Sequence, residues 1–233
     1  MNDDRNRAWA AAGHAAAGHV EDGMRVGLGT GRAAAAGIRA LGERVAGGLR
    51  CTGYPTSHAS ATLARSLGIP LGRLRAPLDL AFDGADAVDP GGLVVKGAGG
   101  ALVRERIVAN SARRFLVLVD APKVVGSLDE WGALPLAVVP FGVGRVLEEL
   151  ADLGPHRRPG LNDDGLALVD LKVPAGADWI GIAARVCVLP GVVDHGLFAV
   201  SLGDVLVGRP DGGWDPAGPA GHAATIPGCP PPR

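Results

Sequence analysis

The sequence has almost no net charge and no long hydrophobic run. Its 23 basic and 24 acidic residues leave a formal charge of −1. A chain without a basic excess lacks the attraction that non-specific nucleic-acid binding and polybasic membrane contacts require. Apolar runs such as 115–119 are far shorter than the roughly 18 residues of a membrane-spanning helix. We therefore predict no nucleic-acid partner and no membrane association.

Cysteine and lysine are also scarce. The cysteines Cys51, Cys187 and Cys229 are far apart and form no CxxC pair, so the sequence indicates neither a disulfide framework nor a zinc site. The N-terminal segment lacks the pattern of a secretory signal, and we expect free thiols in a reducing cytoplasm. Arginine supplies nearly all the cations, yet Lys96 and Lys123 fall in the motifs described below. A compact ammonium at such a position hints at a chemical role.

Apolar residues make up 47% of the chain and recur in alternating strand and helix patterns. A first helix is predicted over 6–22, and a strand at 24–28 then leads through a glycine turn into a helix over 32–47. The alternation continues with strands at 49–51, 78–82, 93–95 and 115–119 and helices at 58–67 and 101–112. This order predicts a mostly parallel sheet covered by helices on both faces.

The pattern changes after residue 130. The predicted order becomes strand, helix, two strands, helix and strand, at 136–139, 142–153, 157–162, 166–172, 176–187 and 192–199. This is a ferredoxin-like order, and a strand at 204–207 returns to the first sheet. The Gly- and Pro-rich residues 210–233 predict a loose tail. The predicted fold class is α/β, with a Rossmann-like parallel-sheet domain (1–130 plus 204–233) and a smaller ferredoxin-like α+β domain (131–203).

Gly29, Thr30 and Gly31 connect the first strand to its helix. Backbone amides in such a turn, together with the start of the helix, can bind an anion. The third glycine of a dinucleotide fingerprint is missing, because position 34 is Ala. A tight turn without any ligand explains the same residues equally well.

Two carboxylates, Asp83 and Asp86, follow the strand at 78–82. Ligands of open α/β sheets bind at the carboxyl ends of strands, where this pair can converge on a polyol or a metal. A metal is the weaker interpretation, because only Asp89 lies nearby as a third acid. Aspartates that cap local amides in a turn are the structural alternative.

The segment after the strand at 93–95 places Lys96 beside Gly97, Gly99 and Gly100, and Glu105 in the helix that follows. A lysine and exposed amides can stabilise an oxyanion, and a nearby carboxylate can transfer protons. A surface ion pair with a neighbouring arginine is the alternative for Glu105.

Lys123 and His195 are further candidates. Lys123 follows the strand at 115–119 and either reaches the same edge of the sheet or is an ordinary surface lysine. His195 has the chemistry of a base, but a hydrogen-bonded structural histidine is the more frequent case.

Taken together and in order, these segments resemble ribose-5-phosphate isomerase of the type A family. The FDGAD and KGxGGAxxRE patterns are the specific part of the resemblance. The matching segments are VGLGTG (26–31), YPTSHASATLARSLGIPL (54–71), LAFDGADAVD (80–89), VKGAGGALVRERIVA (95–109), LVDAPKVV (118–125), LPLAVVPFG (134–142), LNDDGLALVDL (161–171) and PGVVDHGLF (190–198).

The resemblance implies an enzyme that interconverts ribose 5-phosphate and ribulose 5-phosphate without a metal or organic cofactor, as a homodimer or homotetramer. It implies that Glu105 is the base that moves a proton between C1 and C2. It also implies that Asp83, Asp86 and Lys96 contact the hydroxyls and reacting oxygens. The resemblance further implies that the loop 29–33 and Lys123 face the substrate, a small sugar phosphate.

The expected phosphate end departs from the family pattern. Arg32 and Ala33 stand where family members have Ser-Thr, and Trp9 stands where they often have a lysine. Arg32 can grip a phosphate bidentately, fill the pocket, or serve another anionic group. Two alternatives stay open: an isomerase of the same chemistry for a different pentose derivative, and a non-catalytic sugar-phosphate sensor.

Overall fold

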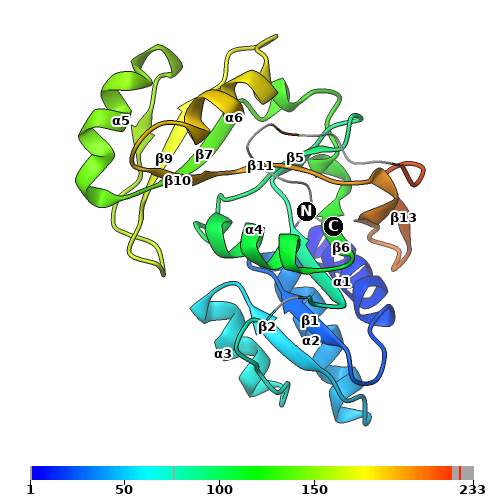
Figure 1. Cartoon of the computed structure of the whole chain (residues 1–233). Helices are drawn as coiled ribbons and strands as arrows, with labels where there is room; N and C mark the ends of the chain where they lie inside the picture. The colour runs from blue at the N-terminus through cyan, green and yellow to red at the C-terminus, as the bar shows by residue number, and fades with distance from the viewer. Residues whose placement is uncertain (1, 76, 222–225, 227–233) are drawn as a thin grey trace.

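A six-stranded sheet forms the centre of the larger part of the molecule (Figure 1). The computed structural model describes residues 2–75, 77–221 and 226. The strand order is β13-β12-β6-β3-β1-β2, and every neighbouring pair is parallel except β12 and β13. The strands are β1 (Arg25–Leu28), β2 (Thr52–Pro55), β3 (Leu80–Gly84), β6 (Phe115–Asp120), β12 (Val205–Gly208) and β13 (Trp214–Pro216).

Both faces of this sheet are covered, because successive apolar side chains of its strands point to opposite sides. Leu116 and Leu118 of β6 pack in one core with α1 (Asn2–Gly18), α2 (Arg32–Ala46) and α3 (His58–Ser66). Val117 and Val119 pack on the other face with α4 (Leu102–Ser111). All six β6 residues are buried, as expected of a central parallel strand.

A smaller antiparallel sheet lies at the other end of the molecule from β1, β2 and α3 (Figure 1). Its order is β10-β7-β9-β8, from β7 (Ala133–Val138), β8 (His156–Arg157), β9 (Ala167–Lys172) and β10 (Val192–His195). Its helices are α5 (Val143–Glu149) and α6 (Trp179–Cys187). A third sheet, β11-β5-β4, joins β4 (Ala87–Val88), β5 (Leu93–Val95) and β11 (Leu197–Ala199). Short 3₁₀ helices occupy Ala121–Lys123, Leu128–Glu130, Pro140–Gly142, Ala151–Leu153 and Leu202–Asp204.

The predicted fold class is confirmed: a mainly parallel α/β sheet is accompanied by a smaller α+β unit of ferredoxin-like strand order. The strand predicted at 204–207 does return to the first sheet, where β12 pairs with β6. The hairpin predicted through Asn162 and Gly165 is also present, since β8 pairs antiparallel with β9. The domain boundaries at 130/131 and 203/204 stay a prediction.

The single strand predicted at 192–199 is wrong, because Gly196 divides it. The Gly196 amide donates to the Pro135 carbonyl at 2.7 Å, and the Gly196 carbonyl accepts from the Lys96 amide at 2.8 Å. The chain therefore leaves the small sheet as β10 and enters the third sheet as β11. The prediction of 93–95 as part of the parallel sheet is also wrong. This segment is β5, which pairs antiparallel with β11 in the third sheet.

Two further expectations differ from the structure. The second strand lies at 52–55 rather than 49–51, and it ends on Pro55, which an edge strand tolerates because one side needs no ladder donor. Residues 210–221 are not a loose tail throughout, because β13 pairs with β12. The rest of the predicted tail apart from Ile226, and with it Cys229, lies outside the described residues. Cys51 is buried and Cys187 exposed, and both are free thiols.

Arg106 of α4 binds residues of both the small sheet and the third sheet, in β10 and β11. Its Nε lies 2.7 Å from both carboxylate oxygens of Asp194, and its Nη2 donates to the Leu197 carbonyl at 2.9 Å. The guanidinium also stacks on the Phe198 ring, 3.9 Å from its centroid. Arg106 is 9% exposed, so its removal leaves buried polar groups without partners.

We expect Arg106→Met to lower the free energy of unfolding by roughly 3–5 kcal/mol, because it leaves Asp194 uncompensated. For a protein of this size that is a fall in Tm of roughly 6–20 °C by thermal denaturation. Arg104→Met is the matched control on the same helix, where the Arg104–Asp164 pair is more exposed and is expected to contribute about 1 kcal/mol or less. Equal losses in the two variants would contradict this account.

Candidate functional site

The candidate site lies where the strand order of the large sheet reverses. From β1 the chain moves outward to β2 and then returns to the other side of β1 as β3. The connections after β1 and β3 therefore diverge, which opens a crevice at the carboxyl ends of these strands. A pocket of about 290 Å³ occupies this place. Its walls come from the turn after β1, the end of β3, the loop after Lys96, and α1, α4 and β6.

The turn after β1 is organised around the Asp83 carboxylate. Asp83 Oδ1 accepts from the Thr30 amide at 2.9 Å and from the Gly84 amide at 2.7 Å. Gly29 must be glycine here, because a Cβ would overlap the Asp83 carboxyl group. Gly31 has φ +99°, a conformation that glycine adopts without strain. One amide of the predicted anion-binding turn thus binds an internal carboxylate.

Lys96 lies between two carboxylates. Its Nζ is 3.0 Å from Asp83 Oδ2 and 3.3 Å from Glu105 Oε2, and it donates a hydrogen bond to the Gly84 carbonyl. The three side chains are between 2% and 4% exposed, so water screens this cluster very little. Glu105 reaches Lys96 from the first turn of α4.

Burial and mutual repulsion shift the protonation of this cluster. Loss of solvation, together with the charge of Asp83, raises the pKa of Glu105 from 4.5 to about 8, against the attraction of Lys96. Burial also raises the pKa of Asp83, although Lys96 and two amides act in the opposite direction. For Lys96, burial lowers the pKa, but Asp83 and Glu105 outweigh it and the net direction is upward.

Burial raises the pKa of both carboxyl groups, but the contacts of the two groups differ. Asp83 accepts two amide N–H groups in addition to its contact with Lys96, whereas Glu105 contacts only Lys96 among the residues that the structure describes. The hydrogen bonds favour the ionised form of Asp83. These contacts favour Glu105 as the carboxyl group that exchanges a proton near pH 8, where ordinary carboxyl groups are already ionised.

Asp86 and Lys123 line the pocket beside this cluster. Asp86 Oδ2 accepts from the Ala98 amide at 2.9 Å, and its Oδ1 lies 4.0 Å from Lys123 Nζ. Asp120, at the end of β6, is 2% exposed and binds Arg5 Nε at 2.7 Å. Its second oxygen, Oδ1, is buried and has no hydrogen-bond partner among the described residues.

Two arginine side chains lie over the ring of Trp9, which lines the pocket. The Arg32 guanidinium lies 4.7 Å from the centre of the Trp9 ring, and the Arg5 guanidinium lies 5.1 Å from it. Arg32 and Trp9 line the pocket together with the start of α2. Among the residues that the structure describes, Arg32 forms no ion pair with a carboxylate, so its donors are available to an anionic group.

The structure gathers the predicted site residues in one place. Those that line the pocket are Thr30, Gly31, Arg32, Ala33, Asp86, Lys96, Gly97, Gly99, Glu105 and Lys123. Asp83 lies beneath the pocket against Lys96, Gly29 lies against Asp83, and Gly100 lines a neighbouring cavity. Their roles toward a substrate stay predictions.

Two alternatives from the sequence are decided by these contacts. Glu105 does not form a surface ion pair with a neighbouring arginine, because its side chain is buried and contacts Lys96. The neighbouring arginines bind other carboxylates: Arg104 binds Asp164, and Arg106 binds Asp194. His195 is a buried structural residue whose Nδ1 accepts from the Leu197 amide. Burial and the nearby Arg106 charge lower the pKa of His195 to about 3.

Sequence reasoning missed Asp120 and Arg158 as parts of this region. Asp120 lines the pocket, and Arg158 binds the backbone of the loop that follows Lys96. The end of a predicted strand was the available signal for Asp120. No local pattern pointed to Arg158, because it lies 61 residues beyond Gly97 in the chain.

Metal-binding and membrane-spanning features are absent from the part of the chain that the structure describes. Within residues 2–75, 77–221 and 226, no three His, Cys, Asp or Glu side chains are grouped so as to hold a metal ion. No helix within the same ranges is long and apolar enough to cross a membrane.

The sequence is similar to those of known ribose-5-phosphate isomerases. The family model described as ribose 5-phosphate isomerase A (phosphoriboisomerase A) matches residues 52–212. The ribose-5-phosphate isomerase A of Roseiflexus castenholzii is 45% identical over 83% of this chain and 88% of its own length. That of Thermomicrobium roseum is 44% identical over 88% of this chain and 92% of its own length.

Solved structures show the same similarity. Ribose 5-phosphate isomerase A from Methanocaldococcus jannaschii superposes with a TM-score of 0.81 at 34% identity, over 89% of this chain and 96% of that one. A D-ribose-5-phosphate isomerase in complex with phospho-erythronic acid gives a TM-score of 0.82 at 30% identity, over 91% and 98%. The fold, the site and these relatives define an enzyme of the isomerase class. The chain belongs to the ribose 5-phosphate isomerase A family.

The raised pKa of Glu105 predicts a dependence of stability on pH. Because the folded state holds this proton up to about pH 8 while the unfolded state releases it near 4.5, the contribution is complete below 4.5 and is lost as the pH rises through 8. Glu105→Gln cannot ionise. We therefore expect its Tm relative to wild type to increase from pH 5 to pH 9, by the equivalent of about 2–4 kcal/mol in unfolding free energy.

The control is Glu148→Gln, which makes the same substitution on an exposed position of α5. Its Tm should follow that of wild type at every pH. A Glu105→Gln protein whose Tm difference from wild type stays constant from pH 5 to pH 9 would rule out the raised pKa.

Proposed function

We propose that this chain interconverts ribose 5-phosphate and ribulose 5-phosphate through an enediolate, with Glu105 as the base. The observation that carries the proposal is the buried Lys96 ammonium, 3.3 Å from the Glu105 carboxyl group in the pocket at the switch point. The activity named for the family relatives supports the same substrate. The bound phospho-erythronic acid of one relative supports a sugar-phosphate acid as a ligand for this fold.

One carboxylate suffices for both proton transfers. Ionised Glu105 removes the proton from C2 of the open-chain aldose, and the carbonyl electrons move to O1 to form the enediolate. A proton then passes from O2 to O1, and Glu105 returns its proton to C1, which leaves the ketose with its carbonyl at C2. C1 and C2 are adjacent, so a single base reaches both without moving far. A pKa near 8 makes Glu105 a stronger base than an ordinary carboxylate.

Lys96 stabilises the negative charge that appears on the enediolate oxygens. An ammonium fixed in a site with little water stabilises such charge more than it would in solution. Asp83 keeps Lys96 in place and charged, and Asp86 accepts hydrogen bonds from the sugar hydroxyls. Once Glu105 has returned the proton to C1, it is ionised again, as it was at the start of the turnover.

Arg32 holds the phosphate in this proposal. Its guanidinium is stacked on Trp9 with no carboxylate partner among the described residues, and Arg32 and Ala33 at the start of α2 line the pocket. The planar fork of an arginine matches two phosphate oxygens. Arg32 thus takes the place of the Ser-Thr pair, and Lys123 adds a second positive charge at the rim.

Glu105→Gln is expected to lower kcat for ribose 5-phosphate by at least about 100-fold, because the amide cannot accept the C2 proton. Ketose formation in the purified protein measures this loss. In D₂O, the wild-type ketose should carry solvent deuterium at C1, since the proton on Glu105 exchanges. Turnover in Glu105→Gln within a few-fold of wild type, or in Glu148→Gln reduced as severely, would refute the assignment of the base.

Arg32→Met is expected to raise KM for ribose 5-phosphate by roughly 10- to 100-fold with little change in kcat. This is the loss of a charge-assisted hydrogen bond that binds ground state and transition state alike. The control is Arg39→Met, which removes the same charge from an exposed position on the same helix. Unchanged KM in Arg32→Met would place the phosphate elsewhere, and a substrate panel in which another pentose derivative turns over faster would favour the alternative substrate.

The remaining expectations stay predictions. Assembly as a homodimer or homotetramer and location in the cytoplasm are proposed from the family resemblance. Among the alternatives, a non-catalytic sensor has no need of a buried base beside Lys96, and the relatives are named as isomerases.

A further inference from the structure

Arg158 connects the small sheet to the loop that follows Lys96. Its Nε and Nη2 donate to the two carboxylate oxygens of Asp170 on β9, at 2.7 and 2.6 Å. Its remaining nitrogen, Nη1, donates to the carbonyls of Gly97 and Ala98, both at 2.9 Å. A guanidinium held bidentately has a fixed orientation, so these two carbonyl oxygens meet a rigid, charged donor.

The contacts of Arg158 determine where two backbone N–H groups point. In a planar trans peptide the N–H lies opposite the C=O. Because Arg158 holds the carbonyls of Gly97 and Ala98, the N–H groups of Ala98 and Gly99 point away from it. The Ala98 N–H donates to Asp86 Oδ2 at 2.9 Å. Gly99 lines the pocket, and its N–H donates to no other residue that the structure describes.

The glycine at position 97 makes this arrangement possible. Gly97 has φ +108°, which a residue with a side chain rarely adopts. The Gly97 carbonyl also accepts from the Gly100 amide at 3.0 Å, which closes the loop into a turn. Ala98 and Gly99 are exposed, so the loop depends on such hydrogen bonds rather than on burial of its side chains.

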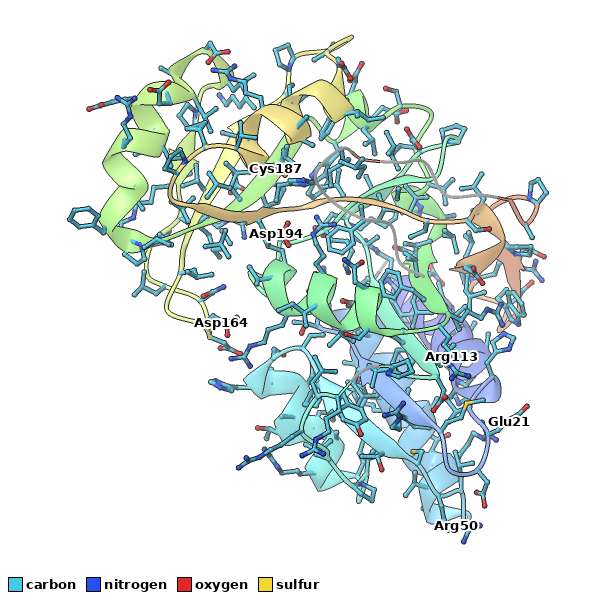
Figure 2. The ribbon with its side chains drawn as sticks, in the orientation of Figure 1. Glu21, Arg50, Arg113, Asp164, Cys187 and Asp194 are labelled. Atoms are coloured by element: carbon cyan, nitrogen blue, oxygen red, sulfur yellow. The ribbon has the colours of Figure 1, made fainter. Side chains whose placement is uncertain are left out.

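A second contact from the same hairpin supports the loop. Asn162 Nδ2 donates to the Gly100 carbonyl at 3.0 Å, and Asp164 binds Arg104 of α4 at 2.6 Å. Figure 2 shows Asp164 at the end of the hairpin that extends from the small sheet. Residues of the small-sheet hairpin therefore bind the carbonyl groups of this loop. Gly97 and Gly99 of the same loop line the pocket.

We propose that Arg158, oriented by Asp170, is a positioning residue of the isomerisation. It acts through the peptide groups of Gly97 and Ala98, so that the Ala98 N–H holds Asp86 and the Gly99 N–H meets a reacting oxygen of the enediolate. Its charge also polarises the two peptides and strengthens their N–H groups as donors. This proposal rests on the proposed function and gives the small sheet a part in the chemistry.

The test compares Arg158→Met with Arg185→Met. Arg185 makes the same kind of contact in the small sheet unit, with both oxygens of Asp152 and the Glu149 carbonyl, but away from the pocket. We expect Arg158→Met to lower kcat by about 10- to 100-fold, the size of effect that a displaced catalytic group produces. Its affinity for phospho-erythronic acid should fall, while its affinity for inorganic phosphate should stay within about twofold of wild type. Arg185→Met should keep wild-type kcat.

A double-mutant cycle with Asp86→Asn separates positioning from general destabilisation. If Arg158 acts partly through Asp86, Arg158→Met should cost less in the Asp86→Asn background than in wild type. Should Arg158→Met fail to fold, Arg158→Lys replaces it, with a loss of kcat still expected because one ammonium cannot reproduce the fork. A folded Arg158 variant with kcat within twofold of wild type, or an equal loss in Arg185→Met, overturns the proposal. Absence of turnover in wild type would instead refute the proposed function.

Discussion

The buried contact between Lys96 and two carboxylates is the constraint on which the other features of the site depend. An ammonium taken out of water costs several kcal/mol unless opposite charges compensate it. Asp83 and Glu105 supply that compensation, but together they carry one negative charge more than Lys96 can balance. The surplus is relieved when one carboxyl group holds a proton, and the amides of Thr30 and Gly84 favour the ionised form of Asp83. The same electrostatics that make the cluster stable thus produce a base of unusual strength.

The fold brings these groups together from separate parts of the chain. Asp83 lies near the end of β3 in the large sheet, Lys96 follows a strand of the third sheet, and Glu105 lies in the first turn of α4. The third sheet continues through Gly196 into the small sheet, and the small sheet in turn contacts the loop after Lys96 through Arg158. The smaller unit therefore contacts the pocket directly, because Arg158 donates hydrogen bonds to the loop that follows Lys96.

Local sequence patterns predicted most of the elements and the gathering of the site, because strand ends of a parallel sheet meet at one edge. They did not predict that β5 leaves the parallel sheet or that Gly196 splits a strand, since a short apolar run does not reveal its partner strand. The burial of Glu105 could not be read from residues 104–106, which look like a charged surface. Contacts such as Arg5–Asp120 and Arg158–Gly97 join residues 115 and 61 positions apart, and only the folded chain shows them. The departure at Arg32 was visible in the sequence, but its stacking on Trp9 was not.

The protonation of Glu105 tests the central claim most directly. Carboxyl carbon NMR of the free protein, with glutamate labelled and Glu105→Gln used for assignment, follows this group through its own titration. The account predicts a midpoint for Glu105 near pH 8, well above the ordinary value of 4.5. A midpoint near 4.5 would contradict it, because Lys96 would then stabilise both carboxylates fully and the site would contain no base of raised strength.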